Sequence, residues 1–154
     1  MRVISGSDYD HVGMLVRGDN RELFVVEALA EGGVQIHEFT DHLIFCWHDC
    51  YKTVSFRKLE CERDGGFDEK VARKTVEWTG IPYSLGVGEI TRQVTTGQHK
   101  SFFCSELIAA MYKFLGFIPQ ARPTNQLWPS SFGRNLPLIN ARLGEISYVV
   151  YNTS

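Results

Sequence analysis

The sequence lacks any strong excess of charge of one sign. Its 154 residues carry 16 lysine and arginine side chains against 18 aspartate and glutamate side chains, which gives a net charge of −2. Nucleic acids and anionic membrane surfaces are usually bound by concentrated basic side chains, and these are absent from the pattern. We therefore expect no nucleic-acid partner.

Long apolar runs are also missing. No run approaches the ~20 residues that span a bilayer, and the first residues do not show a basic segment followed by an apolar one. The four cysteines stand at irregular spacings, which argues against a disulfide framework and for reduced thiols. We expect a cytoplasmic protein with no stable membrane insertion.

Internal repeats and linkers are absent as well, and 44% of the residues are hydrophobic. A chain of this length and composition can bury a substantial core, so we expect one domain over residues 1–154. Periodicity and turn residues predict a strand-rich first third followed by helices, with a loop over residues 83–101 and an ordered wrap over 119–140. The expected strands are residues 9–17, 22–29, 33–39, 53–59 and 146–151, with 53–59 extending the first sheet, and the expected helices are 68–79 and one that starts at about Cys104.

A histidine before one strand and a cysteine before one helix are the most informative residues. His11 heads an apolar strand, and Cys104 begins an apolar helix stripe. The first turn of a helix favours a thiolate, and an imidazole nearby can accept and return its proton. Cys104 and His11 are therefore the candidate nucleophile and base, although a small buried cysteine and an edge histidine would give the same pattern.

Glu27 supports the catalytic interpretation. It interrupts an apolar run, where carboxylates seldom occur without a partner. If residues 9–17 and 22–29 form a hairpin centred near Asp19, Glu27 faces His11 and can fix the orientation of the ring, as the third member of a triad does. The alternative for Glu27 alone is an edge carboxylate that points to water.

These residues and their surroundings resemble a known family. His11-Val12-Gly13, the glutamate on the next strand, and Phe103-Cys104-Ser105-Glu106-Leu107 are similar to the circularly permuted NlpC/P60 group, in particular the YiiX/YaeF-like amidases, with lecithin retinol acyltransferase-like enzymes more distant. Looser matches are Ile81-Pro82-Tyr83 and the stretch from Pro123-Thr124 to Ser131. Asn125 stands where the family usually has proline, and Ser84 where an acidic residue is common.

The resemblance implies a fold, a mechanism and a site. The fold is α+β and circularly permuted papain-like, with an antiparallel sheet packed against two main helices and the cysteine at a helix N-terminus. The catalytic set is Cys104, His11 and Glu27, and the substrate contacts are Tyr83, Ser105 and Thr124. The activity is amide hydrolysis in small peptides through an acyl-enzyme, or else acyl transfer or hydrolysis on lipid esters or thioesters. No metal or organic cofactor is needed.

Two other classes of function stay open in the sequence. Cys46, His48 and Cys50 alternate, and Cys61 or His42 would complete a zinc site, but structural zinc sites usually have tighter paired spacings. We therefore expect no metal. A binding domain that has lost turnover is the other alternative, and a retained set of nucleophile, base and carboxylate argues against it.

Overall fold

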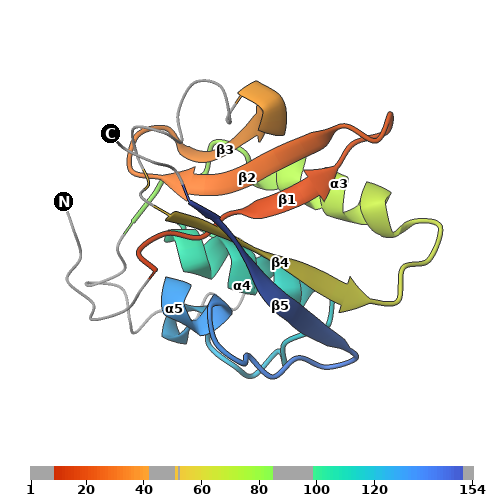
Figure 1. Cartoon of the computed structure of the whole chain (residues 1–154). Coiled ribbons are helices and arrows are strands. Elements are labelled where there is room, and N and C mark those ends of the chain that lie inside the picture. Colours follow the sequence, from red (N-terminus) through yellow and green to blue (C-terminus); the bar gives the residue numbers. More distant parts are fainter. Residues whose placement is uncertain (1–8, 42–50, 52, 85–98, 151–154) are drawn as a thin grey trace.

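The structure is an α+β arrangement of antiparallel sheets and two main helices, as the sequence predicts (Figure 1). It is a computed structural model that describes residues 9–41, 51, 53–84 and 99–150. Within these ranges the strands form a three-stranded sheet in the order β1-β2-β3 and a two-stranded ribbon of β4 and β5.

The first sheet contains β1 (Met14–Arg17), β2 (Leu23–Leu29) and β3 (Gly33–Glu38). The predictions for β2 and β3 are confirmed. The prediction that the first strand starts at residue 9 is wrong, because the chain joins the ladder only at Met14, which pairs with Val26. His11 therefore lies ahead of the strand, where side-chain contacts hold it in place of backbone pairing.

The ribbon contains β4 (Thr53–Cys61) and β5 (Ala141–Val150). The expectation that the fourth strand extends the first sheet is wrong, because β4 pairs with β5. The physical reason is the length of β5, which begins at Ala141 instead of the expected residue 146 and offers partners along the whole of β4. A bulge opposite Lys58 shifts the register between Arg57 and Leu59.

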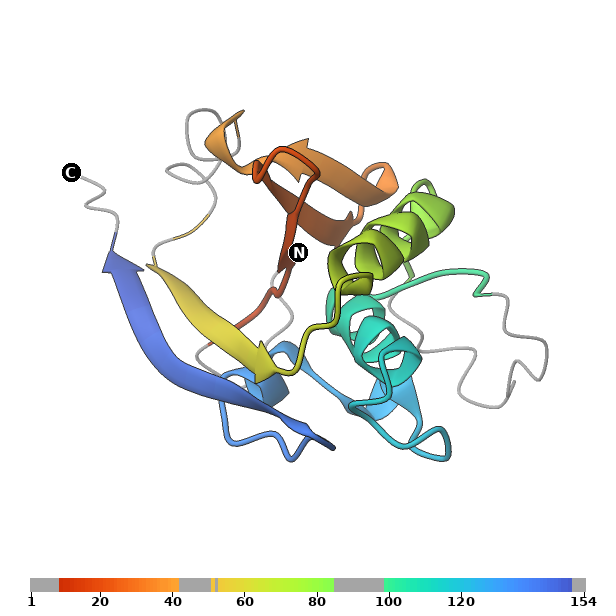
Figure 2. The ribbon, with the colours of Figure 1, turned by 90° about the vertical axis from the view of Figure 1, so that its right-hand side faces the viewer.

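Helices α3 (Phe67–Trp78) and α4 (Cys104–Phe114) are the two predicted helices. They cover the face of the first sheet that carries Val16, Val26 and Ala28. In Figure 2 the two helices lie on one side of the molecule and the ribbon of β4 and β5 lies on the opposite side. Leu107, Ile108 and Met111 project from α4 into this core and are almost completely buried. Burial of each such side chain stabilises the fold by about 1.5–3 kcal/mol, so α4 is held mainly by packing.

A chain of backbone hydrogen bonds ties the residues before α4 to the first sheet. Gly80 N–H donates to Val34 O, and Val34 N–H donates to Ile81 O, each at 2.9 Å. Gly33 permits this close approach, because a Cβ there would lie 2.2 Å from the Ile81 carbonyl oxygen. Two residues later, Tyr83 forms a bridge with Phe102. The start of α4 is thereby positioned against the sheet edge.

Residues 119–140 run over the surface as expected and include η1 (Thr124–Gln126) and α5 (Pro129–Phe132). No helix in the described part of the chain is long and apolar enough to cross a membrane. His42, Cys46, His48 and Cys50, the candidate zinc ligands, lie outside the described residues.

The side chain of Arg57 joins the ribbon to the segment around α5. Its guanidinium donates to the carbonyls of Gly144 at 2.7 Å and Leu143 at 3.1 Å on β5, and to those of Phe132 at 3.0 Å and Arg134 at 2.5 Å. Four carbonyls from two segments therefore depend on one planar group, whose fork of donors lysine does not have.

Replacement of Arg57 by lysine should lower the free energy of unfolding by about 2–3 kcal/mol, because hydrogen bonds from a charged donor are lost. Urea unfolding followed by circular dichroism measures the change. The matched control is Arg142→Lys, at a mostly exposed arginine that pairs with Glu60; it should change stability by less than about 0.5 kcal/mol. Equal effects of the two substitutions would contradict the role given to Arg57.

Candidate active site

Cys104 is the first residue of α4, and its side chain is buried. The preceding residue, Phe103, is extended and donates its N–H to Glu106 Oε2 at 3.3 Å, so a glutamate caps the helix from within its first turn. The remaining free amide groups of that turn make this end of the helix electropositive. The thiol therefore stands where a negative charge is favoured.

His11 and Glu27 form a hydrogen-bonded pair. The distance from His11 Nε2 to Glu27 Oε2 is 2.7 Å, and Glu27 is only 3% exposed in the middle of β2. Gly13 lies between them along the chain, and a Cβ there would meet Glu27 Cβ at 3.4 Å and the Val26 carbonyl oxygen at 3.3 Å. The missing side chain gives the carboxylate room beside the strand.

The pairing of His11 with Glu27 was expected, but the register behind it differs. The sequence suggests a hairpin in which residue 27 lies directly opposite residue 11. The observed ladder pairs Met14 with Val26 and Arg17 with Leu23, which centres the turn one residue later and brings Glu27 opposite Gly13. His11 reaches the carboxylate diagonally, because its backbone has already left the ladder.

The thiol of Cys104 lies close enough to the imidazole of His11 to raise the pKa of the ring. Since Glu27 occupies Nε2, the nitrogen that remains for the thiol is Nδ1. Sulfur, imidazole and carboxylate therefore form one line across three segments that are far apart in the sequence. A proton can move between the thiol and the ring while the carboxylate fixes the ring's orientation.

The electrostatics of this line favour a protonated ring. Burial alone would lower the pKa of His11, but the hydrogen bonds with Cys104 and Glu27 and the negative charges of both residues raise it from 6.5 to about 9. At neutral pH the imidazole is therefore the cation of the site. The ring is thus an imidazolium that lies beside the Glu27 side chain and the sulfur of Cys104.

Tyr51 is a site residue that the sequence prediction missed. Its ring stacks on that of His11 with centroids 5.8 Å apart and an interplanar angle of 19°. Stacking on a flat aromatic face restricts the tilt of the imidazole. The available signal was an aromatic residue just ahead of the predicted strand 53–59, which is too common to have singled out this tyrosine.

Tyr83 and Thr124 lie near the N-terminal end of α4. Burial and the charge of Cys104 both raise the pKa of Tyr83, so its hydroxyl stays protonated near the sulfur. Thr124 donates its hydroxyl to Glu106 Oε1 at 3.4 Å. Burial raises the pKa of Glu106, and the hydrogen bonds from Phe103 and Thr124 partly oppose that change. The contacts of Tyr83 and Thr124 with substrate stay predictions.

Ser105 takes a different part from the substrate contact that the resemblance implies. Its side chain is completely buried, and its hydroxyl donates to the Leu127 carbonyl at 2.6 Å. The hydroxyl faces inward because Ser105 lies on the side of α4 that η1 and the following residues cover. It therefore holds residues after η1 against the helix that carries Cys104.

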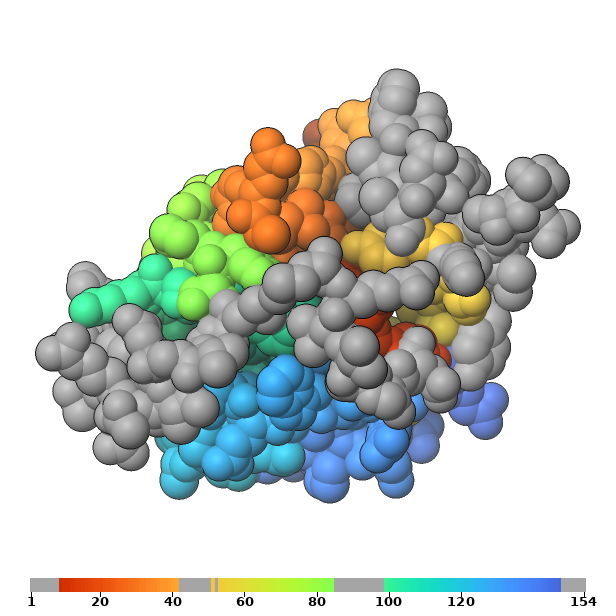
Figure 3. Space-filling view, turned by 90° about the vertical axis from the view of Figure 1, so that its left-hand side faces the viewer, coloured from red at the N-terminus to blue at the C-terminus, as the bar shows by residue number. Residues whose placement is uncertain are grey.

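A cavity of about 530 Å³ begins beside His11 and Glu27. Its lining continues along β1 and β4 to the two main helices, whose arrangement Figure 2 shows. At the end of the cavity that carries His11, the first described residues (red) reach the surface between β4 (yellow) and the 120–140 region (blue), as Figure 3 shows. The volume lies in the range of ~300–1,000 Å³ typical of ligand pockets.

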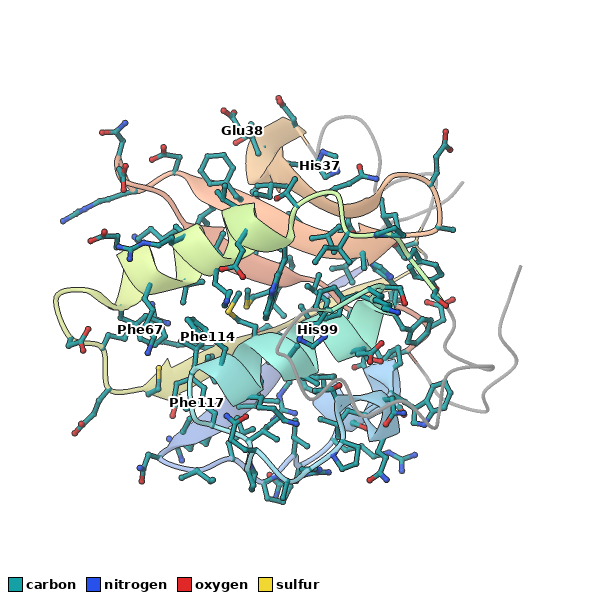
Figure 4. All side chains as sticks on the ribbon, turned by 180° about the vertical axis from the view of Figure 1, so that it is seen from behind. His37, Glu38, Phe67, His99, Phe114 and Phe117 are labelled. Carbon is teal, nitrogen blue, oxygen red and sulfur yellow. The ribbon has the colours of Figure 1, made fainter. Side chains whose placement is uncertain are left out.

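Two other histidines lie in the described part of the chain (Figure 4). His37 is on β3, and His99 packs against Trp78 and Phe102. Burial and the nearby Lys113 and Lys74 lower the pKa of His99. Among residues 9–41, 51, 53–84 and 99–150, no group of three potential ligands lies close enough to hold a metal ion.

Comparison of the chain with protein-family models, curated proteins and solved structures finds no match. The site is therefore interpreted from its own geometry.

NMR titration of the ring protons should give His11 a pKa of about 9. Because this value lies above 6.5, the charge on His11 stabilises the folded protein fully below about pH 6.5, and that contribution is lost as the pH rises through 9. Cys104→Ala and Glu27→Gln should each lower the pKa of His11 by removing a negative partner. His99 is an internal control and should titrate below 6.5 in every variant; a His11 midpoint near 6.5 in the unaltered protein would contradict the arrangement.

Ser105→Ala should lower the free energy of unfolding by about 1–2 kcal/mol, because the Leu127 carbonyl loses a buried donor. If the protein hydrolyses peptides, the Michaelis constant for substrate should stay nearly unchanged. Urea unfolding and steady-state kinetics measure the two effects. A raised Michaelis constant with unchanged stability would restore the role in substrate binding that the sequence suggested.

Proposed function

We propose that the protein is a cysteine hydrolase that cleaves amide bonds of small peptides through an acyl-enzyme on Cys104, in a circularly permuted papain-like domain. The observation that carries the proposal is the line from Cys104 through His11 to Glu27, with a ring whose pKa is raised to about 9. Hydrolases that use a thiol need this combination of nucleophile, proton carrier and orienting group.

The first half-reaction forms the acyl-enzyme. The Cys104 thiolate attacks the carbonyl carbon, and the oxygen of the tetrahedral intermediate is held by the backbone N–H of Cys104 and by a second donor, for which the Tyr83 hydroxyl is the candidate. His11 then gives its proton from Nδ1 to the leaving amine, and the C–N bond breaks. Glu27 keeps the ring in place through Nε2.

The second half-reaction returns the enzyme to its starting state. His11, now neutral, takes a proton from water, and the hydroxide adds to the thioester carbonyl. The tetrahedral intermediate collapses, the acid product leaves, and the Cys104 thiolate faces the imidazolium again. Burial of Glu27 strengthens its hold on the charged ring in both halves of the cycle, because little water screens the pair.

A second candidate is a thiol acyltransferase or lipase that acts on lipid esters or thioesters. The observation that favours it is the apolar character of the helix side chains along the cavity, among them Ile108 and Leu115. Both reactions use the same acyl-enzyme, so the substrates that reach Cys104 distinguish them.

Cys104→Ala should abolish the release of amino acids from short γ-linked peptides, because no other described thiol lies beside His11. His11→Ala should lower kcat/KM by at least about 100-fold, the usual contribution of a positioned general acid and base. Glu27→Gln should retain more activity than His11→Ala, because the amide keeps a neutral hydrogen-bond acceptor near the ring. Amino-acid analysis of the reaction and alkylation of Cys104 by iodoacetamide measure these effects.

The matched control is Cys61→Ala, which removes a free cysteine on β4 that lies outside the site. This variant should hydrolyse peptides at the rate of the unaltered protein. Full peptide hydrolysis by Cys104→Ala would refute the proposal, and labelling of Cys104 by a long-chain acyl thioester without any peptide hydrolysis would favour the second candidate.

A further inference from the structure

The residues that line the cavity show which parts of the strands face it. From β2 only alternate residues contribute, namely Leu23, Val25 and Glu27. From β1 and from residues 53–59 of β4, every successive residue contributes. Since side chains alternate between the two faces of a strand, an alternate pattern marks a face and a continuous one marks an edge. The free edges of β1 and β4 are therefore walls of the cavity.

Hydrogen bonding at the β1–β2 turn shows which backbone groups of β1 point toward the cavity. Gly18 N–H donates to Glu22 O at 2.8 Å, so Gly18 and Glu22 are a hydrogen-bonded pair of the antiparallel ladder. Such pairs recur at every second residue, which assigns Val16 and Met14 to bonds with β2. Leu15 and Arg17 consequently turn their N–H and C=O groups outward.

The opposite edge of the same sheet is β3, which follows the same alternation and has its outward backbone groups hydrogen-bonded to the chain after α3. On β3, Val34 is the outward residue, and its N–H and C=O bond to Ile81 and Gly80. In the part of the chain that the structure describes, Leu15 and Arg17 have no such backbone partner, and β1 and β4 are not hydrogen-bonded to each other. In Figure 1 the two strands diverge from the end near the first described residues.

We propose that the cavity between the edges of β1 and β4 binds an extended peptide that adds to β1 as a strand and leads its scissile bond toward His11, the lining residue that neighbours Cys104. The proposal rests on the function proposed above and names how its substrate is held. Main-chain hydrogen bonds to Leu15 and Arg17 supply the affinity, and alternate peptide side chains face the apolar floor of Ile108, Tyr112 and Leu115 from α4.

The outward backbone groups favour a peptide over an acyl chain. An extended peptide carries donors and acceptors at the spacing that an edge strand presents. A hydrocarbon chain along the same wall would displace water from these N–H and C=O groups and leave them without partners. From His11 to Arg17 the wall spans ~20 Å at the rise of an extended chain, which corresponds to about six peptide residues.

The experiment uses the full-length Cys104→Ala protein, so that peptides bind without turnover. The probes are N-acetylated, C-terminally amidated hexapeptides from a randomised pool, and the member that the protein retains best is resynthesised. Amide hydrogen exchange, followed by NMR, should slow at Leu15 and Arg17 when this peptide binds. The amides of Met14 and Val16 already bond to β2 and should change less.

Two substitutions of Leu15 distinguish the contribution of its backbone N–H to peptide binding from that of its side chain. Leu15→Pro removes the outward N–H while leaving the bonds to β2, and Leu15→Ala truncates the side chain and keeps that N–H. Leu15→Pro should weaken binding of the hexapeptide about three- to tenfold more than Leu15→Ala does, the effect of one hydrogen bond. N-methylation of the peptide, one residue at a time, should identify the peptide residue whose N–H donates to the Leu15 carbonyl.

Each outcome decides between the proposals. Peptide binding with unchanged amide hydrogen exchange at Leu15 and Arg17 would overturn the proposal that the peptide adds to β1, and so would equal effects of the two Leu15 variants. Neither result would contradict hydrolysis at Cys104. Failure of every hexapeptide to bind, with binding of N-hexadecanoylglycine, also overturns that proposal and assigns the cavity to an acyl chain. Protection of both amides by a peptide that the unaltered protein does not cleave would support peptide binding at the edge of β1 and contradict the proposed hydrolysis.

Discussion

The hydrogen bond between Glu27 and His11 is the interaction on which the site depends. A carboxylate that is 3% exposed in the middle of a strand is tolerated only with a partner, and His11 Nε2 supplies one at 2.7 Å. In return, Glu27 leaves Nδ1 toward Cys104 and helps to raise the pKa of the ring to about 9. The charge state and the orientation of the imidazole therefore have the same cause.

Three segments meet at this bond because the fold fixes each of them separately. Glu27 belongs to the central strand of the first sheet, where its backbone pairs with Gln35 on β3. Cys104 is placed by the bridge between Tyr83 and Phe102 and by the glutamate that caps α4. Only His11 has no regular backbone pairing, and its ring is held by side chains on either side.

The sequence predicted the helices and most strands, but it did not predict which distant segments pair with one another. Periodicity located α3, α4, β2 and β3, and the helix start at Cys104 followed from its apolar stripe. The partner of β4 did not follow, because strict alternation over residues 53–59 shows that a strand has two different faces and not which strand lies beside it. The register of β1 was misplaced by the turn, since a shift of its centre by one residue preserves the hydrophobic pattern. Tyr51 was missed for a related reason: an aromatic residue before a strand carries no information about the ring that it will stack on.

The early departure of the chain from the β1 ladder links the catalytic line to the cavity. If pairing with β2 continued back to residue 9, as the sequence suggested, the observed register would hold the backbone of His11 opposite Leu29, and Glu27 would be only its diagonal neighbour. Because the ladder stops at Met14, the imidazole is free to lie between the carboxylate and the thiol. The same short strand turns Leu15 and Arg17 outward along the cavity wall that ends at this imidazole. The edge that is proposed to bind an extended chain therefore leads toward the imidazole that acts as the acid in the proposed hydrolysis.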